Sequence, residues 1–117
     1  MLCLMIRPKY VADILEGIKT IEYRSWNTNY RGDFFIGCCS TAFTRGYLAA
    51  VAELTDCKYS EQDHIYKWYL SNVRIIKPVY IRGQLRLFET GINNYDIINT
   101  DDEINAAYDE AEKWMIK

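Results

Sequence analysis

Three charged side chains lie close together in one short apolar stretch of the chain. Lys19, Glu22 and Arg24 fall within Gly-Ile-Lys-Thr-Ile-Glu-Tyr-Arg at residues 17–24. Ionised groups lose free energy on leaving water unless they are paired or serve a site. The two cations suit a phosphate, and the carboxylate can accept from an exocyclic amine or hold the cations in position. The cluster therefore has two interpretations, an ion pair that fixes strand register or the floor of a ligand pocket.

A strand is expected to carry these side chains. Ile21 and Tyr23 fall on one face of residues 19–24, whereas the polar side chains of Thr20, Glu22 and Arg24 fall on the other. This alternation is typical of a strand, and it places the heads of Glu22 and Arg24 within reach of each other. Lys19 stands where the strand begins.

A short helix is predicted just before this strand, over residues 8–16. Pro8 suits the first helical position, and the apolar residues Val11, Ile14 and Leu15 repeat at helical spacing. Gly17 supplies the left-handed residue that ends a helix. The strand bearing the charges therefore follows directly from a helix end.

Further apolar runs predict strands at residues 1–6, 33–40, 46–54, 65–76 and 79–89, with Pro78 interrupting the last two. Residues 59–64 are expected to form a connection. A capping box at residues 100–103 starts a helix predicted over residues 101–116. About six strands and two helices indicate one β-rich α+β domain, a small closed or nearly closed barrel at residues 1–90. A helical extension at residues 91–117 would be packed on the same domain.

Several motifs occur in a fixed order along the chain. They are Ile6-x-Pro8, Gly17-x-Lys19-x-x-Glu22-x-Arg24, Tyr30-Arg31-Gly32, Trp68-x-Leu70-x-Asn72-Val73-Arg74 and Gly83. Together they resemble the ASCH domain, a member of the PUA-like barrel superfamily. The resemblance runs to about residue 88 and leaves the terminal helix outside.

The resemblance implies that single-stranded RNA or a nucleotide-like ligand binds in a cleft beside the charged motif. Lys19, Glu22 and Arg24 would form the floor of this pocket, and Arg31 with the loop bearing Ser40 and Arg45 would form its rim. Trp26 or Tyr30 would stack on an unpaired base. The ligand-binding residues are therefore expected to be Lys19, Thr20, Glu22, Arg24, Trp26, Arg31, Ser40 and Arg45.

An enzyme is the alternative. One bacterial ASCH-like protein removes an acetyl group from acetylated cytidine with a lysine at the place of Lys19 and a threonine three residues later. This chain has Glu22 there, and a carboxylate is unsuited to the acyl-transfer role of a hydroxyl. Ribonuclease activity is a second possibility, although His64 is the sole histidine and lies in no motif. A small hydrolase would use Lys19 and Glu22; a protein-interaction module ranks third.

The distribution of charge along the chain limits the kinds of partner that it can bind. The net charge is −2, but residues 1–90 carry twelve Lys or Arg against nine Asp or Glu, and residues 91–117 carry two against seven. A mildly basic body without a dense basic stripe indicates a small nucleic-acid footprint.

The four cysteines match no metal-ligand spacing, and no Gly-rich phosphate loop is present, so neither a metal nor a cofactor is expected. No apolar run can span a bilayer, and a cytoplasmic protein with no membrane partner is predicted.

Overall fold

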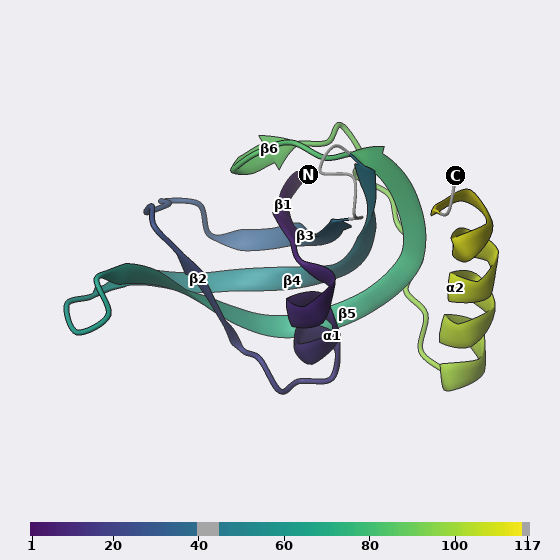
Figure 1. Ribbon diagram of the computed structural model, residues 1–117, viewed down its shortest axis with the longest axis horizontal. Helices are drawn as coiled ribbons and strands as arrows, with labels where there is room; N and C mark the ends of the chain where they lie inside the picture. The colour runs from purple at the N-terminus through teal and green to yellow at the C-terminus, as the bar shows by residue number, and fades with distance from the viewer. Residues whose placement is uncertain (40–44, 116–117) are drawn as a thin grey trace.

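The computed structural model describes residues 1–39 and 45–115, with side chains described to residue 110. In this part of the chain, six strands form one sheet in the order β2-β5-β4-β3-β1-β6, with helices α1 and α2 outside it (Figure 1). The elements are β1 (Leu2–Ile6), α1 (Pro8–Leu15), β2 (Ile21–Arg24), β3 (Gly32–Cys39), β4 (Arg45–Ser60), β5 (Ile65–Arg82), β6 (Leu87–Glu89) and α2 (Asp101–Met115).

The sheet curls because its two longest strands bend. β4 and β5 pair over their whole length, and their register shifts at three places along β4. Such irregularities increase the local twist and bend of a strand. Figure 1 shows β5 curving around one side of the molecule. The concave sheet encloses buried apolar side chains, among them Phe34, Ile36, Leu54 and Trp68. The predicted small barrel-like α+β fold is confirmed, and β2 and β6 are the edge strands of this half-barrel.

The end of α1 determines where β2 begins. Gly17 has a φ of +79°, and the amide of Ile18 donates to the Asp13 carbonyl at 2.9 Å. This Schellman arrangement ends the helix at the predicted glycine. The Lys19 amide also donates to the Asp13 carbonyl, so Lys19 still belongs to the helix end. β2 therefore begins at Ile21, two residues later than the alternation predicts.

The prediction that Pro78 divides two strands is wrong. β5 continues through Pro78 because the pairing with β4 is irregular there: Leu48 pairs with Val79, and Ala50 pairs with Ile75. A proline fits where a ladder hydrogen bond is already missing. The strand instead ends at Arg82, and β6 begins at Leu87 after residues 83–86. β4 also extends to Ser60, beyond the end predicted at residue 54.

The predicted helix near the C-terminus is confirmed as α2. Its first turn is capped by Thr100, whose Oγ1 accepts from the Glu103 amide at 3.1 Å. α2 lies beside the curved part of β5, and the rings of Tyr47 and Tyr108 meet edge to face at 5.7 Å. Within the described residues, neither helix has the length and apolar character needed to cross a membrane.

Candidate functional site

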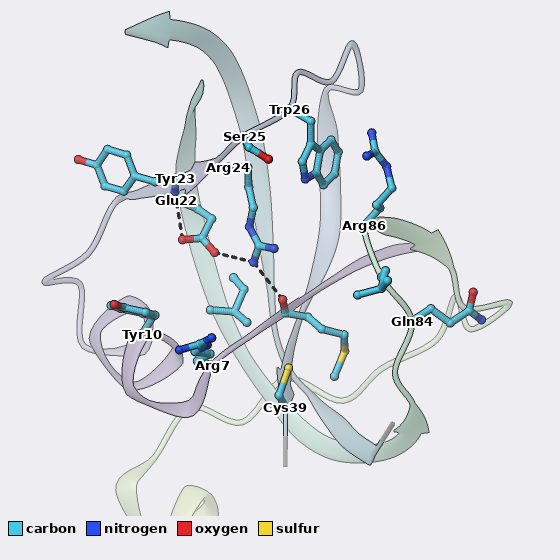
Figure 2. Close-up of a pocket in the computed structure, with 13 residues that line it drawn as sticks. Arg7, Tyr10, Glu22, Tyr23, Arg24, Ser25, Trp26, Cys39, Gln84 and Arg86 are labelled. Carbon is cyan, nitrogen blue, oxygen red and sulfur yellow. Dashed lines mark hydrogen bonds and ion pairs between the residues drawn. The ribbon is translucent and has the colours of Figure 1, made fainter. Parts of the chain in front are cut away.

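A cavity of about 410 Å³ lies between β2 and the residues that precede β6 (Figure 2). We call this boundary between β2 and residues 83–86 the seam, and residues 83–86 the strap. The cavity is lined by side chains from β1, the first turns of α1, β2, the end of β3 and the strap. Because the two edge strands do not pair, side chains rather than backbone ladders line this opening.

Glu22 is the buried acid of the site, with 5% of its surface exposed. Its Oε2 lies 2.8 Å from Arg24 Nη2, and its Oε1 lies 3.3 Å from Lys19 Nζ. The Tyr23 amide also donates to Oε1 at 3.1 Å. The ion pair, one of the two interpretations of the sequence, is therefore present in the structure. Because one carboxylate faces two cations, the cluster keeps a positive charge, and Glu22 and Arg24 still line an open cavity.

Arg24 links strand β2 to strand β1 beside the cavity. Its Nη2 donates to the Met5 carbonyl at 3.0 Å as well as to Glu22. β6 pairs with residues 2–4 of β1, so Met5 lies just beyond that pairing. A guanidinium offers five N–H donors in a rigid plane. Arg24 can therefore satisfy these two acceptors and keep other donors for a ligand.

Lys19 is the second cation beside Glu22. Its Nζ lies 5.2 Å from the centre of the Tyr10 ring and 4.9 Å from that of Tyr23, which is the geometry of a cation–π contact. Lys19 is not among the described residues that line the cavity; it lines two neighbouring recesses instead. Lys19 therefore contacts the Glu22 carboxylate without lining the cavity itself.

Trp26 and Arg86 stack across the seam. The Arg86 guanidinium carbon lies 4.5 Å from the centre of the Trp26 ring, and the two side chains lie next to each other in Figure 2. The fully buried Trp68 meets Trp26 edge to face at 4.6 Å and donates from Nε1 to the Trp26 carbonyl at 3.2 Å. The stack thus joins the chain that follows β2 to the strap.

Four of the described residues that the sequence placed at the site, namely Lys19, Thr20, Arg31 and Arg45, do not line this cavity. Thr20 lies with Lys19 in the neighbouring recesses. Arg31 is 3.5 Å from Asp56 and donates to backbone carbonyls of its own loop. Arg45 begins β4 and is engaged in other contacts. Ser40 lies outside the described residues. Glu22, Arg24 and Trp26 line the cavity, and Lys19 contacts Glu22.

Sequence reasoning missed Arg7, Cys39 and the strap residues Gln84 and Arg86. No motif spacing marks them; the Arg-Pro step at the start of α1 was the one local signal. Burial raises the pKa of the Cys39 thiol, although the guanidinium groups of Arg24 and Arg7 oppose this. Cys39 therefore stays a neutral thiol at physiological pH. The residues described contain no group of His, Cys, Asp or Glu side chains that could hold a metal ion.

Fold and site together define a small curled-sheet domain with a basic recess at the boundary between its two edge strands. The sequence model of the ASCH domain matches residues 4–111, and the chain therefore belongs to the ASCH domain family. This match includes most of α2, which the motif resemblance had left outside. Comparison with curated proteins finds no match.

Proposed function

We propose that this chain binds single-stranded RNA, or a nucleotide-like ligand, in the cavity at the seam. One observation carries the proposal: three arginines, Arg7, Arg24 and Arg86, line the cavity, against the single carboxylate of Glu22. That carboxylate is already neutralised by Lys19 and Arg24. ASCH domains are linked to RNA binding, which gives the same ligand class.

The charge balance favours an anionic ligand. The chain as a whole has a net charge of −2, so the concentration of guanidinium groups at the cavity is local. Arg7 is exposed and makes no ion pair with any residue that the structure describes. A cleft lined by one sign of charge raises the local concentration of ligands of the opposite sign. The planar fork of a guanidinium group matches the geometry of a phosphate, which it binds through two parallel hydrogen bonds.

The dimensions of the cavity favour a small footprint. A volume of about 410 Å³ is within the range of small-molecule sites, roughly 300–1,000 Å³. It provides room for about one nucleotide unit, not for a length of duplex. Bases are accessible for such a pocket in single strands, bulges and ends, where they can leave the stack. The expected ligand is therefore an unpaired nucleotide, free or within RNA.

Fluorescence anisotropy with a short labelled single-stranded RNA, measured at several salt concentrations, tests the proposal. Arg24→Met should weaken binding roughly 10-fold and lower the salt slope by about one, because one phosphate contact is lost. Arg74→Met is a matched control. Arg74 pairs with Asp33 at 2.7 Å and its side chain is 22% exposed, close to the 25% of Arg24, but it does not line the cavity.

Two results would contradict the proposal. One is an absence of RNA binding by the folded wild-type chain. The other is equal loss of affinity in Arg24→Met and Arg74→Met, which would place the binding surface elsewhere. Circular dichroism of each variant establishes that the curled sheet is intact before affinities are compared.

A further inference from the structure

We infer that Arg86 is the platform on which the base of the ligand stacks, with Trp26 as its support. This inference rests on the proposed function, because it concerns the same cavity. A guanidinium is planar, so it can stack on an aromatic ring with one face and on a base with the other. The base, Arg86 and Trp26 would then form three layers across the seam.

Two of the three layers, Arg86 and Trp26, are already in contact in the structure. Arg86 lies 4.5 Å from the centre of the Trp26 ring, and Trp26 is held in turn by its edge-to-face contact and backbone hydrogen bond with Trp68. Trp68 is fully buried, which fixes the position of the Trp26 indole. Arg86 itself is exposed, so its outer face is open to a ligand. A base can therefore add to the stack without moving any of these three side chains.

The backbone of the strap supports the same assignment. Arg86 has a φ of +65°, a conformation that residues with large side chains rarely adopt. Strain of this kind persists where the surrounding structure requires it, and it is common at ligand sites. Here the unusual conformation directs the Arg86 side chain to Trp26 (Figure 2).

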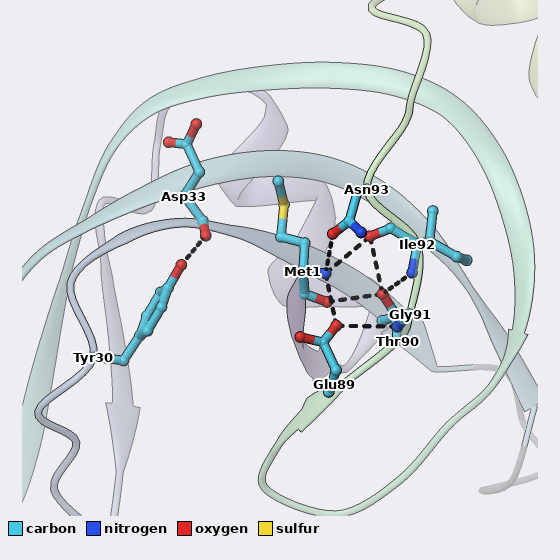
Figure 3. Close-up of polar contacts among 8 residues, drawn as sticks. All are labelled: Met1, Tyr30, Asp33, Glu89, Thr90, Gly91, Ile92 and Asn93. Atoms are coloured by element: carbon cyan, nitrogen blue, oxygen red, sulfur yellow. Dashed lines mark hydrogen bonds and ion pairs between the residues drawn. The ribbon is translucent and has the colours of Figure 1, made fainter.

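The chain after each stacking residue makes polar contacts a few residues further on (Figure 3). Just beyond β6, Thr90 Oγ1 donates to the Met1 carbonyl at 2.7 Å, and the Gly91 amide donates to Glu89 Oε2 at 3.0 Å. In the loop that follows Trp26, the Tyr30 hydroxyl donates to the Asp33 carbonyl. These contacts anchor the chain just beyond β6 and the loop after Trp26, the two segments next to the stack.

A base that stacked on Trp26 directly would have a different consequence. Arg86 covers the ring, so it would first have to move aside, and removing Arg86 would then strengthen binding. Our inference predicts the opposite sign. If removing Arg86 weakens binding, the base stacks on Arg86. If removing Arg86 strengthens binding, Arg86 blocks access of the base to Trp26.

The test pairs protein variants with two RNA probes. The probes are a short single-stranded RNA and the same RNA with one abasic residue at its centre. For the intact RNA, Arg86→Ala should weaken binding roughly 5- to 150-fold, the range for loss of a stacked base. For the abasic RNA it should have a much smaller effect. Arg86→Lys keeps the charge but not the plane, so it should behave like Arg86→Ala on the intact RNA.

Arg82→Ala is the control, because Arg82 is also exposed, lies four residues earlier and does not line the cavity. Tighter binding by Arg86→Ala, or equal losses on the intact and abasic probes, would overturn the platform. If Arg24→Met still weakens binding in that case, the proposed function stands without it. If the wild-type chain binds neither probe, both proposals are overturned. Thermal unfolding of each variant shows that the fold is retained.

Discussion

Arg24 on edge strand β2 donates at 3.0 Å to the backbone carbonyl of Met5 on β1, and both residues line the cavity. The same nitrogen lies 2.8 Å from Glu22. A single guanidinium therefore links an edge strand to the far side of the half-barrel while lining the cavity. Ion pairing and ligand binding, which the sequence left as alternatives, are compatible in this geometry because the pair occupies only part of the guanidinium.

Glu22 should contribute to stability. Glu22→Gln removes the charge that Lys19 and Arg24 share, and both cations are largely buried, with side chains 15% and 25% exposed. Leaving partly buried cations without a counter-charge should lower the free energy of unfolding by about 2 kcal/mol. Urea denaturation monitored by tryptophan fluorescence measures the free energy of unfolding of each variant. Glu61→Gln, in the exposed turn after β4, should change stability little; equal losses in both variants would refute the buried role of Glu22.

Lys19 should affect RNA binding indirectly. Lys19→Met keeps the apolar stem between Tyr10 and Tyr23 but removes the charge beside Glu22. Because Lys19 does not line the cavity, we expect a loss of affinity of roughly 3-fold, smaller than that of Arg24→Met, and no change in salt slope. The anisotropy titration used for Arg24→Met measures both the affinity and the salt slope. A larger loss for Lys19→Met than for Arg24→Met would mean that Lys19 contacts the ligand.

Cys3 should make the chain sensitive to alkali. Burial raises the pKa of the Cys3 thiol from its usual 9.0 to about 12, whereas the unfolded thiol ionises near its usual value. Between pH 9 and 12 the unfolded chain therefore binds fewer protons, so stability is complete below pH 9 and falls as the pH rises. Chemical denaturation across this range measures the slope. Cys3→Ala should make this slope smaller, whereas Cys57→Ala, at a partly exposed position, should not.

Two glycines should differ in their tolerance of a methyl group. A β-carbon at Gly46 would collide with the backbone carbonyl oxygen of Cys38 on β3, which cannot move without disturbing the strand pair. At Gly37 the first obstacle is the sulfur of Met5, a flexible side chain. Gly46→Ala should therefore lower stability by about 1–3 kcal/mol, and Gly37→Ala by less. Melting temperatures in the reverse order would show that the two strands can separate at Gly46.

The sequence by itself determined the local elements and the central charged cluster. Helix α1 ends at Gly17 as predicted, because a left-handed residue is needed there and glycine adopts it without strain. The alternation of Ile21, Glu22, Tyr23 and Arg24 placed the acid and the arginine on one face, and the structure pairs them. These features depend on residues close together in the chain, where periodicity and capping are sufficient.

Only the tertiary structure decided what surrounds that cluster. Arg7, Cys39 and Arg86 come from three separate elements, and they meet because the sheet curls until its two edge strands face each other. The curl comes from irregular pairing between β4 and β5, which also carries the strand through Pro78. Register shifts and the approach of distant edges depend on packing across the whole sheet. For the same physical reason Lys19, close to Glu22 in sequence, does not line the cavity, whereas Arg86 does.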